Sequence, residues 1–309
     1  MPGAGTITVQ AHAKVNLALA VGPPVASGDK QGWHPIASWM APVSLADTLT
    51  LTRLPEGSLS RYAVCWSKDA PRPTTIDWSI TRDLSVRAHL ALEQHAARSL
   101  PLQARLDKRT PVGGGLGGGS SDAAAMLRAG SRLFELDTPI NALHTLSRPL
   151  GSDVAFFLED GAHDRTPSPA LVEGFGDRIE RTPAARGSLV LLLPDFGCPT
   201  PKVYAAFDAV APESSFDDRA AAVRALAQGA DIAAELFNDL AAPAEMVAPQ
   251  LRDLRAAAEA ATATPAHVTG SGSTLFLVAS DPDHADWLVR TVGEQFDASR
   301  LAALAVTLL

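Results

Sequence analysis

Residues 111–125 read Pro-Val-Gly-Gly-Gly-Leu-Gly-Gly-Gly-Ser-Ser-Asp-Ala-Ala-Ala, and this stretch decides how the chain is expected to fold. Glycine occupies six of the seven positions 113–119. Because glycine lacks a Cβ, its backbone adopts φ > 0 and comes close to an anion, while a helix beginning near Ser120 turns unpaired N–H groups and its positive dipole end toward that anion. The stretch therefore predicts a phosphate-binding loop, with a nucleoside triphosphate as the expected ligand.

A flexible Gly/Ser linker is the alternative interpretation of this stretch. Its flanks argue against a linker, because residues 102–108 alternate like a strand and residues 123–134 have a helical pattern. The stretch is not a Walker A motif, since no lysine follows the glycines before Ser120. A kinase built on this loop must take its cationic group from elsewhere in the chain.

The composition is that of an acidic chain long enough for a full core. The 309 residues are 46% hydrophobic and carry a formal charge of −8, which favours two domains and a small anionic metabolite over nucleic acid as the ligand. Cys65 and Cys198 lack metal-ligand spacing, so neither a disulfide framework nor a zinc site is expected. With no signal-peptide pattern and no apolar run of spanning length, we expect a cytoplasmic protein without a membrane partner. The sequence predicts no oligomeric state.

Strand and helix patterns are mixed along the chain without a βαβ repeat, which predicts an α+β fold. In the first part, strands are expected at residues 6–21, 45–54 and 102–108, and helices at residues 85–99, 121–136 and 141–146. In the second part, strands are expected at residues 189–193, 267–268, 274–278 and 303–308, and helices at residues 201–207, 218–228 and 249–261. These later elements predict a layer with its helices on one face.

A second turn rich in glycine and hydroxyl groups spans residues 269–274, Thr-Gly-Ser-Gly-Ser-Thr. Its hydroxyls and free N–H groups suit a phosphate, although a tight turn before a strand is an equally good interpretation of the turn alone. Two such loops in one chain favour function for both, with the second capping a phosphate from the side opposite the first. The candidate residues are Gly270, Ser271, Gly272 and Ser273.

Four segments resemble the GHMP kinase superfamily in order and approximate spacing, over nearly the whole chain. They are residues 13–17 (Ala-Lys-Val-Asn-Leu), 111–125, 150–157 (Leu-Gly-Ser-Asp-Val-Ala-Phe-Phe) and 270–274. Further residues resemble one branch, whose acceptor is a cytidine diphosphate-linked methylerythritol: Gly32-Trp33-His34, Lys108-Arg109, Pro199-Thr200-Pro201 and Phe237-Asn238-Asp239. The resemblance implies a two-domain fold, with an ATP-binding domain at residues 1–187, a C-terminal GHMP domain at residues 188–309 and the active site in the cleft between them.

The resemblance also implies a reaction, in which ATP phosphorylates the tertiary 2-hydroxyl of that acceptor in the non-mevalonate route to isoprenoids. Asp153 would act as base or orienting group at the attacking hydroxyl, and Lys14 would hold it and polarise the hydroxyl, with Asn16 contacting the substrate. The residue patterns leave two alternatives, Asp153 as a helix N-cap and Lys14 on the solvent face of its strand. Mg²⁺ follows from the reaction class, and its protein ligands are not assigned.

The remaining candidates would bind the two substrates. Trp33 offers a flat surface to a pyrimidine and His34 a donor and acceptor to its edge, unless they are a core tryptophan beside a turn histidine. Tyr204, aligned through Thr200 and Pro201, would cover the other face of the ring. Lys108 would meet the nucleotide unless it is solvent-exposed. The residues expected at ATP are Pro111, Gly113, Gly114, Gly115, Leu116, Gly117, Gly118, Gly119, Ser120 and Ser121.

Three departures from the family pattern are visible. Asp83 stands where an asparagine near adenine is common, Asp177 stands where glutamate is usual, and residues 160–169 contain an insertion that reads as an exposed loop. Two other functions remain open. A different kinase of this superfamily, acting on homoserine, mevalonate or a sugar, would not need the Trp33-His34 pair. A non-catalytic nucleotide-binding paralogue would not need both Lys14 and Asp153.

Overall fold

The computed structural model of the chain describes residues 5–159, 166–210, 214–232 and 235–309. The chain forms two compact units that are interleaved along the sequence. Unit 1 contains the described residues of Met1–Ala13, Leu45–Val112 and Gly117–Pro167, and unit 2 those of Lys14–Ser44, Gly113–Leu116 and Ser168–Leu309. The predicted boundary at residues 187 and 188 does not coincide with these units, since residues 14–44, 113–116 and 168–187 belong to unit 2.

Two long strands account for this interleaving. β1 (Thr6–Val21) and β2 (Ile36–Arg53) both have residues in each unit. A strand pattern reports burial on a face and not which unit the face belongs to. The sequence therefore predicted β1 at its observed bounds, but gave no signal for a change of unit within it.

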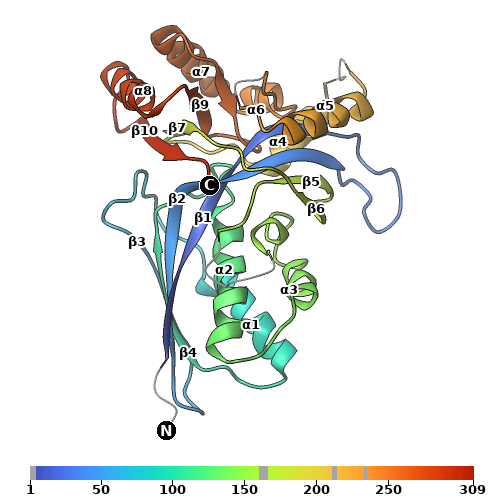
Figure 1. Ribbon diagram of the computed structural model, residues 1–309, viewed down its shortest axis with the longest axis vertical. Coiled ribbons are helices and arrows are strands. Elements are labelled where there is room, and N and C mark those ends of the chain that lie inside the picture. The colour runs from blue at the N-terminus through green and yellow to red at the C-terminus, as the bar shows by residue number, and fades with distance from the viewer. Residues whose placement is uncertain (1–4, 160–165, 211–213, 233–234) are drawn as a thin grey trace. The chain divides into compact units, whose positions relative to one another are not determined.

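Unit 1 combines a strand ladder with three helices (Figure 1). The later half of β2 pairs antiparallel with β4 (Leu102–Lys108), and β4 pairs parallel with β3 (Arg61–Trp66). The helices are α1 (Leu84–Ala96), α2 (Gly118–Leu133) and α3 (Ile140–Ser147), with short 3₁₀ turns η1 (Ile80–Arg82) and η2 (Ala155–Phe157). β4 has its predicted bounds. α2 begins three residues before its predicted start at residue 121 and so includes two glycines of the loop.

Small residues let the helices of unit 1 pack closely. The side chains of Ala123, Ala124 and Ala125 on α2 are at most 1% exposed, so this face is core and not surface. A Cβ at Gly130 would lie 2.8 Å from Leu92 Cδ1 of α1, which shows how near the two helices approach. Alanine and glycine in α2 thus serve packing as well as helix formation.

Unit 2 contains an antiparallel sheet in the order β10-β7-β9-β8. Its strands are β7 (Ser188–Pro194), β8 (Ala266–Val268), β9 (Leu275–Ala279) and β10 (Leu301–Thr307). The other elements are β5 (Ala170–Gly174), β6 (Arg178–Arg181), α4 (Thr200–Asp208), α5 (Phe216–Gly229), α6 (Ala241–Val247), α7 (Pro249–Thr262) and α8 (Pro282–Gln295). β5 pairs antiparallel with the first residues of β2 and with β6.

One core joins the sheet of unit 2 to its helices. Val190 and Leu192, alternate residues of β7, belong to the same buried cluster as Leu251 of α7 and Leu288 of α8, and Figure 1 shows both helices beside these strands. The expected layer of strands with helices packed on it is therefore observed. α8 was not predicted, although Asp281 accepts a hydrogen bond from His284 N at 2.8 Å and Pro282 follows it, which is a normal helix start.

Two sequence-level expectations concern segments outside these elements. Residues 160–165 of the expected insertion lie outside the described residues, and residues 166–169 are neither helix nor strand. Among the residues that the structure describes, no helix combines the length and apolar character needed to cross a bilayer.

A buried histidine connects α1 to two other parts of unit 1. His89 is fully buried, with Nε2 2.9 Å from Leu100 O and Nδ1 2.6 Å from the hydroxyl of Tyr62 on β3. A neutral ring satisfies both contacts by donating from Nε2 and accepting at Nδ1. Burial lowers the pKa of His89, against the raising effects of the Leu100 carbonyl and Glu93.

We expect the stability of the protein to fall as pH drops below about 6.5. With its folded pKa lowered, His89 takes up a proton more readily in the unfolded chain, so its contribution is present above the unfolded pKa and is lost as pH falls through that range. The loss is at most about 1.4 kcal/mol per pH unit in that window. Urea unfolding at several pH values measures the loss of unfolding free energy.

His89→Gln should flatten this pH dependence, while His95→Gln, at an exposed position of α1, should not. Equal slopes for the unmodified protein and both variants would contradict the assignment to His89.

Candidate active site

Lys14 and Asn16 lie on one face of β1 in unit 2. Lys14 is only 3% exposed, and its Nζ donates to Asn16 Oδ1 at 2.6 Å and to Gly115 O at 2.9 Å. The alternative that Lys14 faces solvent is therefore wrong. These two contacts, to a side-chain amide oxygen and a backbone carbonyl oxygen, fix the position of the ammonium.

Asn16 is fixed from two directions. Its Nδ2 donates to Ser38 Oγ at 2.8 Å on β2, and its backbone N–H donates to Thr269 Oγ1 at 2.9 Å. The Ser38 hydroxyl in turn donates to Ala18 O at 2.9 Å. This network sets which way the Asn16 oxygen faces, and so places the Lys14 ammonium.

The structure brings residues 113–116 of the first glycine loop to the second glycine turn, both in unit 2. Lys14 N donates to Leu116 O at 2.9 Å, and Thr274 N donates to Gly114 O at 3.3 Å. Gly115 has φ +78°, and a Cβ on it would lie 2.4 Å from Thr269 O. The two loops are thus in contact at residues 113–116, Gly115 has no room for any side chain, and their service to one site stays a prediction.

The hydroxyl groups of the second turn have partners inside the protein. Ser271 Oγ lies 2.8 Å from Thr200 Oγ1 at the start of α4, and Ser273 Oγ donates to Phe196 O. Asn238 Nδ2 donates to both Val268 O and Gly270 O at 2.8 Å. Asn238 thus shapes the turn, in which the N–H groups of Thr269, Gly272 and Thr274 already donate to backbone carbonyls.

Trp33 and His34 occupy different environments in unit 2. Trp33 is 50% exposed, with Lys30 Nζ 4.0 Å from its ring centroid and the Phe175 ring edge-on at 6.0 Å. The core-tryptophan alternative is therefore wrong. Tyr204 packs beside His34, with ring centroids 5.1 Å apart, whereas the aromatic neighbour of Trp33 is Phe175, which is not among the residues predicted from the sequence. Its signal was the Gly-Phe-Gly turn at residues 174–176.

The two ring nitrogens of His34 have distinct neighbours. Nδ1 lies 2.8 Å from Gly22 O, and Nε2 lies 3.4 Å from Asp208 Oδ1. A carbonyl only accepts, so Nδ1 carries the hydrogen. In the neutral ring Nε2 is then an acceptor, and in the charged ring it donates to Asp208.

The remaining part of the first glycine loop starts α2 in unit 1. Gly117 is the N-cap with φ +68°, and the N–H groups of residues 118–120 have no partner within the helix. Ser121 is buried and Ser120 half-buried at this turn. Ser120 Oγ lies 3.8 Å from where a Cβ on Gly151 would be, so the segment that carries Asp153 passes beside the helix start. The geometry is that of an anion-binding helix terminus.

Asp153 precedes η2, and the N-cap position of η2 is Val154 without a side-chain capping hydrogen bond. The N-cap alternative for Asp153 is therefore not supported. Asp83 takes that role in α1, because its carboxylate accepts from Ser85 N at 2.9 Å and from Ser85 Oγ at 2.6 Å. The departure from asparagine at this position thus has a structural use as a cap.

Lys108 is buried between two carboxylates that the sequence reasoning missed. Its Nζ lies 2.5 Å from Asp47 Oδ2 and 2.6 Å from Asp122 Oδ2, so the solvent-exposed alternative is wrong. Burial opposes the charged form, but the two carboxylates raise the pKa of Lys108 above its usual value. With its ammonium occupied in this way, the structure does not support a direct contact between Lys108 and the nucleotide.

No group of three or more His, Cys, Asp or Glu side chains within the described ranges could hold a metal ion. The expected Mg²⁺ therefore remains a prediction from the reaction class. Hydroxyl and carboxylate oxygens of Ser120, Ser121 and Asp153 in unit 1 are donors of the type that Mg²⁺ prefers, and phosphates and water complete such sites.

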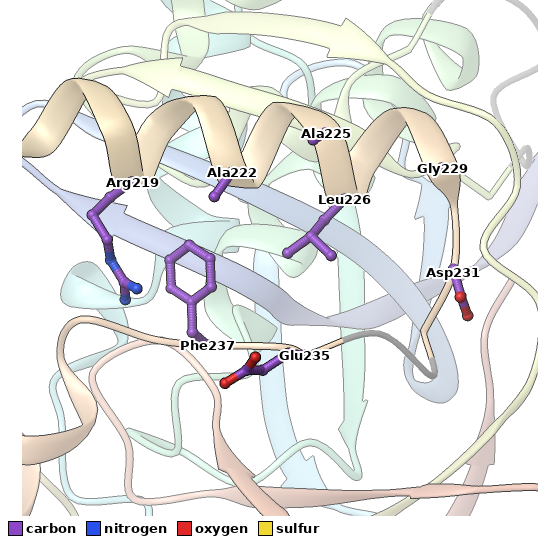
Figure 2. A pocket seen from close by; sticks show the side chains of 8 residues that line it. All are labelled: Arg219, Ala222, Ala225, Leu226, Gly229, Asp231, Glu235 and Phe237. Carbon is purple, nitrogen blue, oxygen red and sulfur yellow. The ribbon is translucent and has the colours of Figure 1, made fainter. Parts of the chain in front are cut away.

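A pocket of about 560 Å³ in unit 2 is lined by residues of α5 and of the chain after it, up to Phe237 (Figure 2). Arg219 lines it, but its guanidinium lies 3.6 Å from the Phe237 ring centroid and its Nε donates to Asp239 Oδ1 at 2.9 Å. None of the candidate residues is in this lining, which is Arg219, Ala222, Ala225, Leu226, Gly229, Asp231, Glu235 and Phe237.

Comparison with known proteins gives consistent matches. The GHMP kinases N terminal domain matches residues 83–161, and the GHMP kinases C terminal domain matches residues 219–298. The 4-diphosphocytidyl-2-C-methyl-D-erythritol kinase of Thermobifida fusca (strain YX) is 37% identical, covering 91% of this chain and 89% of that protein. The protein of the same name from Chlorobaculum parvum (strain DSM 263 / NCIMB 8327) is 32% identical, covering 94% of each.

Solved structures agree. A crystal structure of 4-(cytidine 5'-diphospho)-2C-methyl-D-erythritol kinase matches with a TM-score of 0.72 and 30% identity, covering 98% of this chain and 99% of that one. Homoserine kinase from Cytophaga hutchinsonii ATCC 33406 matches with a TM-score of 0.69, covering 100% of this chain and 96% of that one. Its identity is 14%, so it shows the shared fold alone.

Two glycines of the loop provide a matched test of the contact between the loops. Gly113 and Gly115 both have φ near +75°, but a Cβ on Gly113 meets nothing within 4 Å, while one on Gly115 meets the Thr269 carbonyl. We expect Gly113→Ala to cost about 1 kcal/mol from backbone strain, and Gly115→Ala about 3 kcal/mol or more because the carbonyl must also move. Urea unfolding measures both, and equal losses would contradict the observed contact.

Proposed function

Since the chain belongs to the GHMP kinases and, within them, to the 4-diphosphocytidyl-2-C-methyl-D-erythritol kinase family, we propose that it transfers the γ-phosphoryl group of ATP to the 2-hydroxyl of 4-diphosphocytidyl-2-C-methyl-D-erythritol. The chain is thus a small-molecule kinase. The observation that carries the choice of acceptor is identity of 32–37% to relatives of that name over most of both chains. We place the reaction in the non-mevalonate isoprenoid route and in the cytoplasm.

The phosphates of ATP bind in this proposal to the N–H groups at the start of α2. Residues 118–120 supply unpaired donors and the helix supplies its positive end. The glycines at residues 113–119 allow the backbone to come close to the phosphates. Mg²⁺, held by Ser120 or Ser121 together with the phosphates, supplies charge neutralisation at the transferred group.

Lys14 and Asp153 act in the proposal on the acceptor hydroxyl. Asp153 orients the hydroxyl and takes its proton, and Lys14 polarises the oxygen and stabilises the charge that develops on it. Support for Lys14 comes from its burial and from the two contacts, with Asn16 Oδ1 and Gly115 O, that hold the ammonium in place. Phosphoryl transfer depends mainly on such positioning.

The cytosine of the acceptor binds in the proposal at Trp33 and His34. The exposed indole of Trp33 offers a stacking face, which the base takes in place of the Lys30 ammonium. His34 Nδ1 donates to Gly22 O, and its Nε2 lies 3.4 Å from Asp208 Oδ1. In the proposal this ring edge and the Asp208 carboxylate together supply hydrogen-bonding groups to the edge of the base.

A panel of acceptors tests the function. Purified protein with ATP and Mg²⁺ should form ADP and a phosphate ester with 4-diphosphocytidyl-2-C-methyl-D-erythritol, and none above background with homoserine, mevalonate or a free sugar, which offer Trp33 no base to stack on. The assay measures ADP by a coupled reaction and identifies the ester by phosphorus NMR. A kcat/KM for homoserine or mevalonate equal to that for the cytidylyl acceptor would overturn the proposal.

Removal of the proposed base gives a second test. Asp153→Asn should lower kcat on the order of 10²- to 10⁴-fold and leave the KM for ATP nearly unchanged, because an amide keeps the shape but cannot take a proton. Exposed Asp69→Asn in the same unit is the control and should retain full turnover. The double variant Lys14→Met/Asp153→Asn should be about as slow as the slower single variant, since the two groups act together. Unchanged kcat for Asp153→Asn would reject the base role.

A further inference from the structure

Three charged side chains form a buried cluster beside the first turn of α2. Asp47 of β2 is 0% exposed, Lys108 at the end of β4 is 4% exposed, and Asp122 of α2 is 2% exposed. Lys108 Nζ contacts one oxygen of each carboxylate, at 2.5 Å for Asp47 and 2.6 Å for Asp122. All three belong to unit 1, and the kinase mechanism proposed above uses none of them directly.

Asp47 holds more than the ammonium. Its Oδ2 accepts from Lys108 Nζ, and its Oδ1 accepts from the backbone N–H groups of Arg109 at 2.5 Å and Thr110 at 2.7 Å. One carboxylate therefore fixes three consecutive residues at the point where β4 ends and the chain enters the glycine loop. Buried charge-assisted hydrogen bonds of this kind are strong and geometrically demanding.

The fixed segment in turn contacts the start of α2. A Cβ on Gly118, the first residue of the helix, would lie 2.8 Å from Thr110 Cγ2 and 3.7 Å from Asp47 Oδ2. Thr110 therefore packs directly on the backbone whose N–H groups are free for an anion. The position of this first turn depends on Thr110, and that of Thr110 depends on Asp47.

Asp122 differs from Asp47 although both contact Lys108. Its Oδ2 accepts from Lys108, but its Oδ1 has no hydrogen-bond partner among the described residues. Burial raises the pKa of Asp122 well above its ordinary value, against the lowering effect of Lys108. With one ammonium between two carboxylates, the cluster needs the charge of only one of them.

We propose that Asp47 is a positioning residue for the ATP phosphates: its carboxylate holds residues 108–110 against the start of α2 and so sets where the N–H groups of residues 118–120 lie. The inference rests on the proposed binding of ATP at this helix terminus. Asp122 supports Lys108 but does not set the loop. Lys108 alone cannot position the loop, because its ammonium contacts only Oδ2 of Asp47, whereas Oδ1 accepts from the backbone N–H groups of Arg109 and Thr110.

Asparagine substitutions separate the two carboxylates. In Asp47→Asn the new amide has one acceptor and one donor end, so it must turn its NH₂ toward either the Lys108 ammonium or the two backbone N–H groups. In Asp122→Asn the amide turns its oxygen to Lys108 and its NH₂ to the side where Oδ1 has no hydrogen-bond partner among the described residues. Both variants replace a carboxylate with an amide, but only Asp47→Asn disturbs hydrogen bonds to the backbone of Arg109 and Thr110.

The test compares KM for ATP, KM for the cytidylyl acceptor and kcat. Turnover by the unmodified protein is established first, so that a failure of the proposed function is recognised separately. Asp47→Asn should raise the KM for ATP on the order of tenfold or more while changing the KM for the acceptor about twofold, because displacing the helix start by a fraction of an ångström weakens phosphate contacts. Asp122→Asn should change both values by no more than about twofold.

A variant with a purely structural defect is the control for stability. His89→Gln lies in the same unit and removes buried hydrogen bonds, so it should lower Tm without raising the KM for ATP. If Asp47→Asn does not fold, Thr110→Ser removes the methyl group that meets Gly118 and should raise the KM for ATP by itself. An unchanged KM for ATP in Asp47→Asn, or in Thr110→Ser where the first does not fold, would overturn the proposal, and so would an equal rise in Asp122→Asn.

Discussion

A glycine-rich loop must be held in one conformation without side chains of its own, and in this chain the contacts that hold the loop come from outside it. In unit 2, Lys14 donates to Leu116 O from its backbone and to Gly115 O from its ammonium, and Thr274 N donates to Gly114 O. In unit 1, Asp47 holds the residues that lead into the loop. Glycine loses more conformational freedom on ordering than any other residue. These contacts offset that entropic cost, which the loop has no side chains of its own to offset.

Two lysine side chains are buried near the loop, and each is held by hydrogen bonds. An isolated ion in the interior is expensive, but Lys108 is balanced by a carboxylate, and Lys14 is held by a side-chain amide and a backbone carbonyl. The surroundings of the two lysines differ: Lys108 contacts the carboxylates of Asp47 and Asp122, whereas the contacts of Lys14 with Asn16 and Gly115 are to neutral oxygens.

Local sequence patterns predicted the elements that depend on neighbouring residues. β1 and β4 have their expected bounds, and the glycine run leads into a helix start near its expected position, because its cause is local backbone freedom. The contacts that organise the site join distant residues, with separations of 61 between Asp47 and Lys108 and 14 between Lys108 and Asp122. A single aspartate within a strand pattern does not indicate that its carboxylate will accept hydrogen bonds from two backbone N–H groups and an ammonium. Phe175 beside Trp33 escaped prediction for the same reason.

The two halves of the proposed reaction are read from different parts of the chain. The fold alone does not select the acceptor, since one fold hosts different activities. The acceptor must be selected by side chains that contact the part in which it differs from other alcohols, here the cytidylyl group. We expect Trp33 to be of this kind because it is 50% exposed, and His34 because its Nδ1 is held by Gly22 O. An exposed indole suits the face of a planar base and an oriented imidazole suits a hydrogen-bonding edge, and a cytidylyl group has both while a simple alcohol has neither.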